Sequence, residues 1–359
     1  MINVTKTYLP NREKYKNYID QIFDSGWITN NGEFTRELTN RLARYLGVKN
    51  LLLVSNGTLA LQVAYKLLGL KGDVITTPFS FVATTSSLVW EGLNPIFVDI
   101  DMNSFNMDPQ KIEVRITEAT SSIVPVHVFG NPCNVEAIGD IAKKHKISVI
   151  YDAAHAFDVK YKDGSVLNYG DVSILSFHAT KTFHTIEGGA LIINDDELFE
   201  KAKWMINFGI QGPSKIVGLG INAKMNEFQA AMGLCLLDDI EYLNQERKTR
   251  HNRYLQALQD IRSIRFPARN PDGSDNHSYF PVVFETESIL LDIIEDLKYV
   301  DIFPRRYFHP SLESLNYLAP QEAPISSDIS KRILCLPLFS ELDDVNQERI
   351  INIVRQRTS

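Results

Sequence analysis

Between residues 50 and 195, short apolar runs alternate with segments whose apolar residues recur every three or four positions. Short apolar runs are typical of buried strands, and a recurrence of 3.6 residues is typical of amphipathic helices. The first such pair is a strand at 51–54 and a helix at 58–68, which Gly69 ends. The alternation predicts an α/β domain whose mostly parallel sheet is covered by helices on both faces.

The rest of this region follows the same pattern. Apolar and β-branched residues cluster in six further expected strands, at 74–76, 95–100, 123–126, 147–151, 172–177 and 190–193. Helices are expected at 80–91, which Gly92 closes, and at 135–146. Pro78 stops the first of the six strands, because proline lacks the N–H that a strand ladder requires.

The character of the chain changes after a long helix predicted at 225–258. Beyond it, a loop rich in Pro, Asn and Gly at 267–273 precedes a short strand and two helices, at 279–284, 288–299 and 344–356. We therefore expect a large domain at 31–245 and a smaller α+β domain at 246–359. The first segment, 1–30, is expected to pack on the small domain.

Composition narrows the class of protein. A chain of 359 residues that is 44% hydrophobic can bury the cores of about two domains. Its net charge is −7, without a basic stripe for nucleic acid, and no run is long enough to span a membrane. The cysteines Cys133, Cys235 and Cys335 lack the spacing of a disulfide framework or a zinc site, so no metal is expected. A reduced, cytoplasmic location is the simplest interpretation.

The first chemical candidate is Lys181, which lies between two predicted strands. The amine of a lysine in such a place is either paired, or it reacts with an aldehyde once burial or a nearby cation lowers its pKa. Asp152 follows the strand at 147–151, and ligands of parallel sheets bind beyond the carboxyl ends of strands. A helix cap is the alternative for Asp152, and a structural role is the alternative for His155 three residues later.

A third candidate joins a strand end to a helix start. Residues 55–58, Ser-Asn-Gly-Thr, would place free N–H groups and a hydroxyl at a helix N-terminus, which suits a phosphate. An ordinary N-cap by Ser or Asn is the alternative. Together, a lysine, an acid at a strand end and a phosphate site are what pyridoxal 5′-phosphate (PLP) requires.

At these residues the chain resembles the DegT/DnrJ/EryC1/StrS family of PLP-dependent sugar aminotransferases. The resemblance covers nearly the whole chain and rests on motifs in a fixed order, at 26–29, 55–58, 78–84, 127–132, 152–156, 176–190 and 222–231. It implies the aspartate-aminotransferase fold, PLP fold type I, with a large mixed sheet that is mostly parallel and a smaller α+β C-terminal domain.

The resemblance also implies roles for single residues. Lys181 would form the Schiff base and move the proton, and Asp152 would pair with the protonated pyridine nitrogen. The other implied cofactor contacts are His155 to the phenolic oxygen, Phe81 on the ring face, and Gly57, Thr58 and Ser176 to the phosphate. Phe81 could instead be part of the core.

A further implied contact crosses between subunits. Asn222, or else Lys224, would reach the phosphate of the neighbouring subunit's cofactor, which makes a homodimer with shared active sites the expected assembly. Asn222 could also be the N-cap of the long helix.

The family transfers an amino group from L-glutamate to a nucleotide-linked keto sugar, cycling through pyridoxamine 5′-phosphate. The segment 176–190 favours the branch that acts at C3 of dTDP-3-keto-6-deoxyhexoses for surface polysaccharide, with C4 aminotransferases or a PLP-dependent dehydratase as alternatives. The dehydratases carry His at the lysine position, which speaks against them here. Candidate substrate contacts are Thr29, Tyr307 and His309, with Arg305 or Arg306 near the diphosphate. His184, where relatives carry Asn, has no assigned role.

Overall fold

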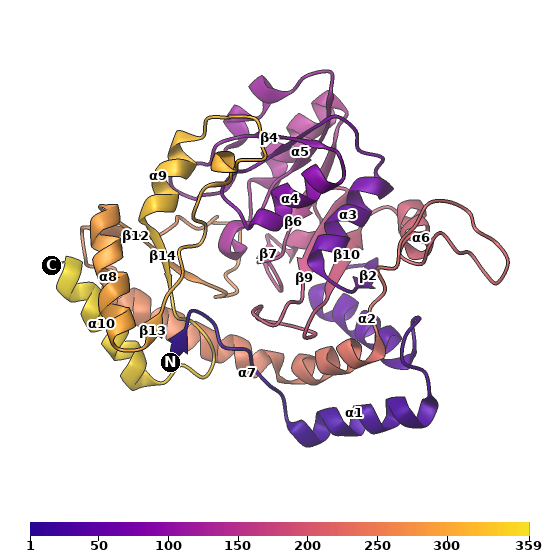
Figure 1. Ribbon diagram of the computed structural model, residues 1–359, viewed down its shortest axis with the longest axis horizontal. Helices are drawn as coiled ribbons and strands as arrows, with labels where there is room; N and C mark the ends of the chain where they lie inside the picture. The colour runs from indigo at the N-terminus through magenta and orange to yellow at the C-terminus, as the bar shows by residue number, and fades with distance from the viewer. Residues whose placement is uncertain (359) are drawn as a thin grey trace.

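A computed structural model describes residues 1–358, and a seven-stranded mixed sheet lies at its centre (Figure 1). All neighbouring strands run parallel except β10, which is antiparallel to both of its neighbours. In spatial order the strands are β2 (Leu51–Val54), β10 (Gly189–Ile193), β9 (Val172–Ser176), β6 (Ser148–Asp152), β5 (Thr120–Val124), β3 (Asp73–Thr76) and β4 (Asn94–Phe97). The expected α/β fold is confirmed.

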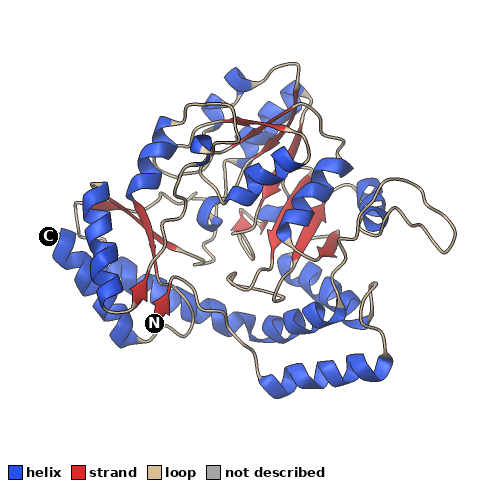
Figure 2. Cartoon of the chain, in the orientation of Figure 1, coloured by secondary structure: helices blue, strands red, loops and turns tan. Residues whose placement is uncertain are grey.

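Helices cover both faces of this sheet, as Figure 2 shows. One apolar core lies between the sheet and the helices α2 (Glu33–Leu46), α5 (Val135–His145) and α7 (Glu227–Leu258). A second core lies on the other face, under α3 (Gly57–Leu67), α4 (Val82–Trp90) and α6 (Asp196–Met205). Ala190 and Ile192 enter the first core and Leu191 and Ile193 the second, because successive strand residues point to opposite faces.

Two predicted strands differ from the observed strands by more than one residue at an end. The run at 95–100 is a strand only to Phe97, and β5 begins at Thr120, three residues before the predicted start. The start of β5 was not predicted because its first residues are polar. They fit inside the sheet because their hydroxyls find partners, as when Ser122 donates to the carbonyl of Ser148 at 3.0 Å. The strand stops at Val124 because Pro125 cannot donate to a ladder.

The smaller C-terminal part is built on a three-stranded antiparallel sheet of β11 (Ile264–Arg265), β12 (Phe280–Phe284) and β14 (Ile333–Leu336). Its core includes residues of α8 (Glu287–Tyr299) and α10 (Asp344–Thr358). The strands β11, β13 (Ile302–Phe303) and β14 and the helix α9 (Pro324–Arg332) of this part were not expected from the sequence. A hairpin of β7 (Lys160–Tyr161) and β8 (Gly164–Ser165) completes the strands of the large part.

The helix α7 belongs to both parts. Leu234 and Leu236 in its first half enter the large core, whereas Tyr254 and Leu258 near its end enter the small one. The expected domain boundary at 245/246 therefore falls inside one continuous helix.

The first 30 residues do not all pack on the small part as expected. β1 (Ile2–Asn3) does, since it pairs in parallel with β13 (Ile302–Phe303). In contrast, α1 (Arg12–Ser25) lies along the first half of α7 (Figure 1). Tyr15 on α1 donates its hydroxyl to the carbonyl of Phe228 at 3.2 Å, which fixes this contact. Among residues 1–358, no helix combines the length and apolarity that crossing a membrane requires.

A buried carboxylate joins α2 to α7. Glu227, only 1% exposed, begins α7 and accepts the backbone N–H groups of Phe34 at 2.8 Å and Thr35 at 3.2 Å, together with the hydroxyl of Thr35. The N-cap position of α2 is Gly32, which has no side chain to do this. A Cβ at Gly32 would lie 2.5 Å from the Glu227 carboxyl carbon, so glycine lets the carboxylate approach.

We predict that Glu227→Ala lowers the free energy of unfolding by about 3 kcal/mol, because three donors lose a charged acceptor. Urea unfolding monitored by circular dichroism measures this. Glu200→Ala serves as the control, since Glu200 is exposed and, within residues 1–358, pairs only with Lys203. Equal stability of the Glu227 variant and the control would contradict the capping role.

Candidate active site

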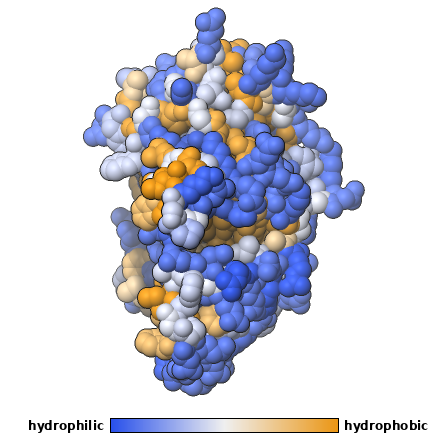
Figure 3. Space-filling model, turned by 90° about the vertical axis from the view of Figure 1, so that its right-hand side faces the viewer, coloured by the Kyte–Doolittle hydropathy of each residue, from blue (hydrophilic) through white to orange (hydrophobic). Residues whose placement is uncertain are grey.

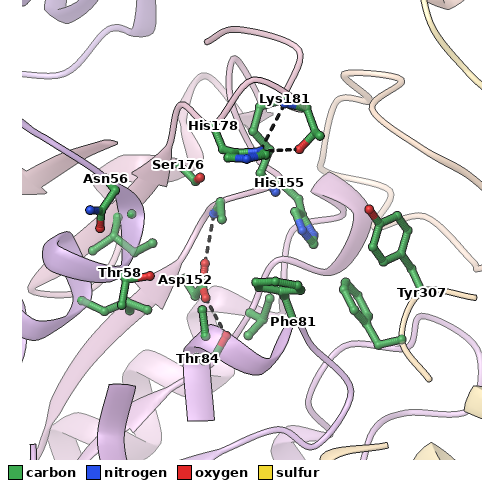
Figure 4. Close-up of a pocket in the computed structure, with 18 of the residues that line it drawn as sticks. Asn56, Thr58, Phe81, Thr84, Asp152, His155, Ser176, His178, Lys181 and Tyr307 are labelled. Atoms are coloured by element: carbon green, nitrogen blue, oxygen red, sulfur yellow. Dashed lines mark hydrogen bonds between the residues drawn. The ribbon is translucent and has the colours of Figure 1, made fainter. Parts of the chain in front are cut away.

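A cavity of about 260 Å³ opens at the carboxyl ends of the central strands (Figure 4). It is lined by residues that the sequence analysis selected from distant segments, namely Gly57, Thr58, Phe81, Asp152, His155, Ser176, Lys181, Arg305 and Tyr307. Asp152 ends β6 and Ser176 ends β9, while α3 begins at Gly57 just after β2. The parallel course of these strands brings their ends to one edge, as expected for a ligand site.

Asp152 is held in a fixed position at the buried side of the cavity. One carboxylate oxygen accepts the hydroxyl of Thr84 on α4 at 2.7 Å, and the other accepts the N–H of Ala154 at 3.1 Å. Burial raises the pKa of Asp152, whereas these two hydrogen bonds and the charge of Lys181 act in the opposite direction. No helix follows Asp152, so the helix-cap alternative is excluded.

Lys181 enters the same cavity from the loop between β9 and β10. Burial lowers its pKa to about 8, although the carboxylate of Asp152 opposes this change. The loop is shaped by backbone hydrogen bonds, since the N–H of Lys181 donates to the carbonyl of His178 at 2.8 Å. A lysine with this pKa carries a substantial fraction of neutral, nucleophilic amine near pH 7.5.

The N-terminus of α3 faces the cavity beside Ser176. Asn56 caps this helix and accepts the N–H of Leu59 at 2.8 Å, so the N–H groups of Gly57 and Thr58 remain available for a ligand. A Cβ at Gly57 would lie 3.0 Å from the Cβ of Ser176. Capping and anion binding are therefore compatible, and the tight approach explains glycine at position 57.

His155 and Phe81 supply the aromatic part of the site. The imidazole of His155 is buried, its Nδ1 has no partner among residues 1–358, and burial holds its pKa well below the usual range. Its ring stacks on Phe308 at 5.6 Å between centroids. Phe81 is 49% exposed and faces the cavity, so it is not part of the core.

Three predicted site residues do not line this cavity: Thr29, Asn222 and His309. The ring of His309 is exposed and lies 3.3 Å from the guanidinium of Arg306, which itself pairs with Glu287. Arg306 therefore has a structural role in the ion pair with Glu287. Arg305 is the arginine that lines the cavity, and its guanidinium lies 4.6 Å from the centre of the Tyr307 ring.

Asn222 and Lys224 lie together outside the cavity of their own chain. The ammonium group of Lys224 donates to the side-chain oxygens of Asn207 and Asn222, both at 2.8 Å. Asn222 is exposed and is not the N-cap of α7, because Asn226 caps that helix. The N-cap alternative for Asn222 is thus excluded.

Sequence reasoning missed Thr84, His178, Glu187 and Tyr279 among the cavity residues. Thr84 lies within the motif at 78–84, but its hydrogen bond to Asp152 joins residues 68 positions apart. Tyr279 is the first residue of the strand predicted at 279–284, and the observed strand β12 begins one residue later, which leaves Tyr279 at the strand end beside the cavity.

The structure also gives a role to His184. This buried imidazole donates Nε2–H to the carbonyl of Tyr8 at 2.8 Å, and its Nδ1 accepts the N–H of Ile186 at 3.2 Å. Both nitrogens are satisfied only by the neutral tautomer that carries its proton on Nε2. His184 therefore ties the lysine loop to the segment that joins β1 to α1.

We predict that His184→Ala lowers the free energy of unfolding by about 2 kcal/mol, because two hydrogen bonds are lost and a cavity is left. His184→Asn should recover part of this loss, because an amide can donate and accept in the same way. Urea unfolding of the three proteins is the measurement. An alanine variant as stable as the wild type would show that the hydrogen bonds of His184 to Tyr8 and Ile186 do not stabilise the protein.

Comparison with known proteins extends this picture over the whole chain. Residues 10–355 match the DegT/DnrJ/EryC1/StrS aminotransferase family model. The chain is 43% identical over 361 residues to the dTDP-4-amino-4,6-dideoxy-D-glucose transaminase of Shigella dysenteriae, covering 99% of this chain and 98% of that protein.

Solved structures agree with this assignment. DesI, determined in the presence of its TDP-sugar product, has a TM-score of 0.92 and 31% identity, and the match covers 98% of this chain and 91% of DesI. NtdA from Bacillus subtilis, determined with the bound cofactor PMP, has a TM-score of 0.89 and 26% identity, with 96% and 81% covered. The chain therefore belongs to the DegT/DnrJ/EryC1/StrS family and is a PLP-dependent sugar-nucleotide transaminase.

Proposed function

We propose that this protein transfers an amino group from L-glutamate to the C4 ketone of a dTDP-linked 4-keto-6-deoxyhexose. The observation that carries the proposal is the joint presence of Lys181 and Asp152 in one cavity of a chain 43% identical to a C4-amino-sugar transaminase. The sequence analysis favoured C3 from the lysine segment. That segment forms the loop carrying the reactive amine, which C3 and C4 aminotransferases both need, so whole-chain similarity is the better guide to the sugar.

The cavity suits the cofactor on several independent grounds. The carboxylate of Asp152 would pair with the protonated pyridine nitrogen, and the unpartnered Nδ1 of His155 would meet the phenolic oxygen. The open N–H groups of Gly57 and Thr58, with the hydroxyl of Ser176, would hold the phosphate. When bound, the cofactor supplies an electron sink that eases proton removal from the carbon bearing the nitrogen.

Lys181 is the group that moves this proton. With a pKa of about 8, its amine both accepts and returns a proton near neutral pH. Asp152 would not share this role, because Thr84 and Ala154 orient its carboxylate, which would pair with the pyridine nitrogen of the bound cofactor. Arg305, next to Tyr307 at the open side of the cavity, offers a cation to the diphosphate of the sugar nucleotide or to a carboxylate of glutamate.

We predict that the protein with L-glutamate aminates dTDP-4-keto-6-deoxy-D-glucose at least tenfold faster than the 3-keto isomer. Mass spectrometry and NMR of the product measure the rate and the position of the new amine. Lys181→Ala is the control that should abolish turnover. Faster amination at C3 would reject the C4 assignment, and no amination of either ketone would reject the proposal as a whole.

We further propose that the amino sugar is used in surface polysaccharide. We also propose that the active sites are shared between the two chains of a homodimer. Support comes from the segment between α6 and α7, which projects from the body of the chain (Figure 1). It exposes Phe208, Ile216 and Leu219, at 52%, 76% and 75%, and holds Asn222 at its end. Hydrophobic patches also lie on that side of the molecule (Figure 3). A second copy that covers them would receive Asn222, Lys224 and Thr29 near its own cavity.

Complementation between inactive chains tests the shared site. Co-expression of Lys181→Ala chains with Asn222→Ala/Lys224→Ala chains should restore about a quarter of the wild-type activity, because half of the dimers then contain one intact site. Lys181→Ala with Asp152→Ala is the matched control. Both changes lie in the same cavity, so no dimer of that mixture contains an intact site. Equal activity of the two mixtures would contradict sharing.

A further inference from the structure

A second group of reactive side chains lies apart from the active-site cavity, where α7 meets the small part of the chain. His251 belongs to α7, whereas Asp275 and His277 belong to the segment between β11 and β12. Their ligand atoms all lie within 4.8 Å of one another. The side chains are 16%, 22% and 16% exposed, so the group is shielded but reachable from solvent.

The two carboxylate oxygens of Asp275 have different surroundings. Oδ1 is fully engaged, because it accepts the backbone N–H of His277 at 2.7 Å and pairs with the guanidinium of Arg269. Oδ2 faces two imidazole nitrogens, Nε2 of His251 at 3.8 Å and Nδ1 of His277 at 3.4 Å. Neither contact is a hydrogen bond, and Nδ1 of His277 has no partner among residues 1–358.

These separations are close to, and somewhat longer than, those of ligands around a shared ion. Zinc binds nitrogen at about 2.0–2.1 Å and carboxylate oxygen at about 2.0–2.2 Å, so neighbouring ligands of a tetrahedral site lie roughly 3.3 Å apart. Oδ2 lies 3.8 and 3.4 Å from the two nitrogens, and all three ligand atoms lie within 4.8 Å of one another, so side-chain adjustments toward a bound ion would complete the geometry. Two imidazoles and one carboxylate are a donor set that suits Zn²⁺, Co²⁺ or Ni²⁺ rather than Mg²⁺ or Ca²⁺.

Arg269 affects this group in two ways. Its pairing with Oδ1 orients the carboxylate and leaves Oδ2 directed at the imidazoles, as outer-shell partners of metal ligands commonly do. Its positive charge also repels a cation, which weakens binding without changing the geometry.

We propose that His251, Asp275 and His277 bind one divalent transition-metal ion such as Zn²⁺, with water completing the coordination. The ion would link α7 to a segment that supports the active site. Asn276, between two of the ligands, donates to the backbone carbonyls of His155 at 2.8 Å and Phe157 at 2.9 Å. The metal site thus lies one residue from the contact that positions the backbone of His155.

Zinc titration of the cofactor-loaded protein, first stripped with a chelator, tests the proposal. A chromophoric competitor reports the affinity, and we expect one ion per chain, with Kd raised at least tenfold in His251→Ala and in His277→Gln. His145→Ala is the matched control and should keep the wild-type Kd, because His145 is a partly exposed histidine that pairs with Glu113. Equal Kd values in all four proteins, or no binding at micromolar Zn²⁺, would overturn the proposal.

Cobalt provides a second measurement that does not depend on the folding of a variant. Wild-type protein loaded with one Co²⁺ per chain should show visible absorption bands between about 500 and 650 nm with the intensity of tetrahedral nitrogen and oxygen coordination. Weak bands of the hydrated ion would contradict the site. Zn²⁺ should also slow amide hydrogen exchange at residues 275–278, and unchanged exchange would count against the link to α7.

Discussion

The reversed strand β10 is the constraint on which the site depends. Gly189, its first residue, stands opposite Val54 of β2 on one side and Ser176 of β9 on the other. The loop carrying Lys181 must therefore turn at the carboxyl edge, directly between the end of β9 and the start of α3. A Cβ at Gly189 would lie 2.8 Å from the carbonyl of Asn56, so only glycine lets the reversed strand fit there. Pairing of backbones, rather than any side-chain contact, brings the amine of Lys181 and the N-terminus of α3 together.

Desolvation then gives each titratable group its chemical character. The same burial that lowers the pKa of Lys181 raises that of Asp152 and lowers that of His155. Hydrogen bonds from Thr84 and Ala154 limit the effect on the carboxylate. As a result, the carboxylate of Asp152 is held in place, the amine of Lys181 has a pKa close to neutral pH, and the imidazole of His155 remains neutral. These are the protonation states that proton transfer on a bound cofactor needs.

The sequence was sufficient for the fold class and for nine of the 21 residues that line the cavity, because the strand pattern places Asp152 at a strand end and the family resemblance adds residues such as Ser176. It was insufficient where side chains meet across long separations. Thr84 on α4 reaches Asp152 at the end of β6, and the ring of His309 contacts Arg306, which pairs with Glu287 outside the cavity. The course of α1 also escaped prediction, since apolar residues on a helix do not say which partner they meet. The local pattern of apolar residues predicts helices and strands. How these elements pack against one another depends on contacts between residues far apart in the sequence, which the pattern does not contain.

The carboxylate of Glu227 has a consequence for how the chain folds. Its acceptor contact with Phe34 spans 193 residues, so the first turn of α2 gains its cap only after more than half of the polypeptide has been synthesised. On the ribosome, the early segment must wait for the start of α7 before α2 can dock in its final form. We therefore expect α2 to become fully protected only after the start of α7 has been synthesised, although α2 lies near the beginning of the chain.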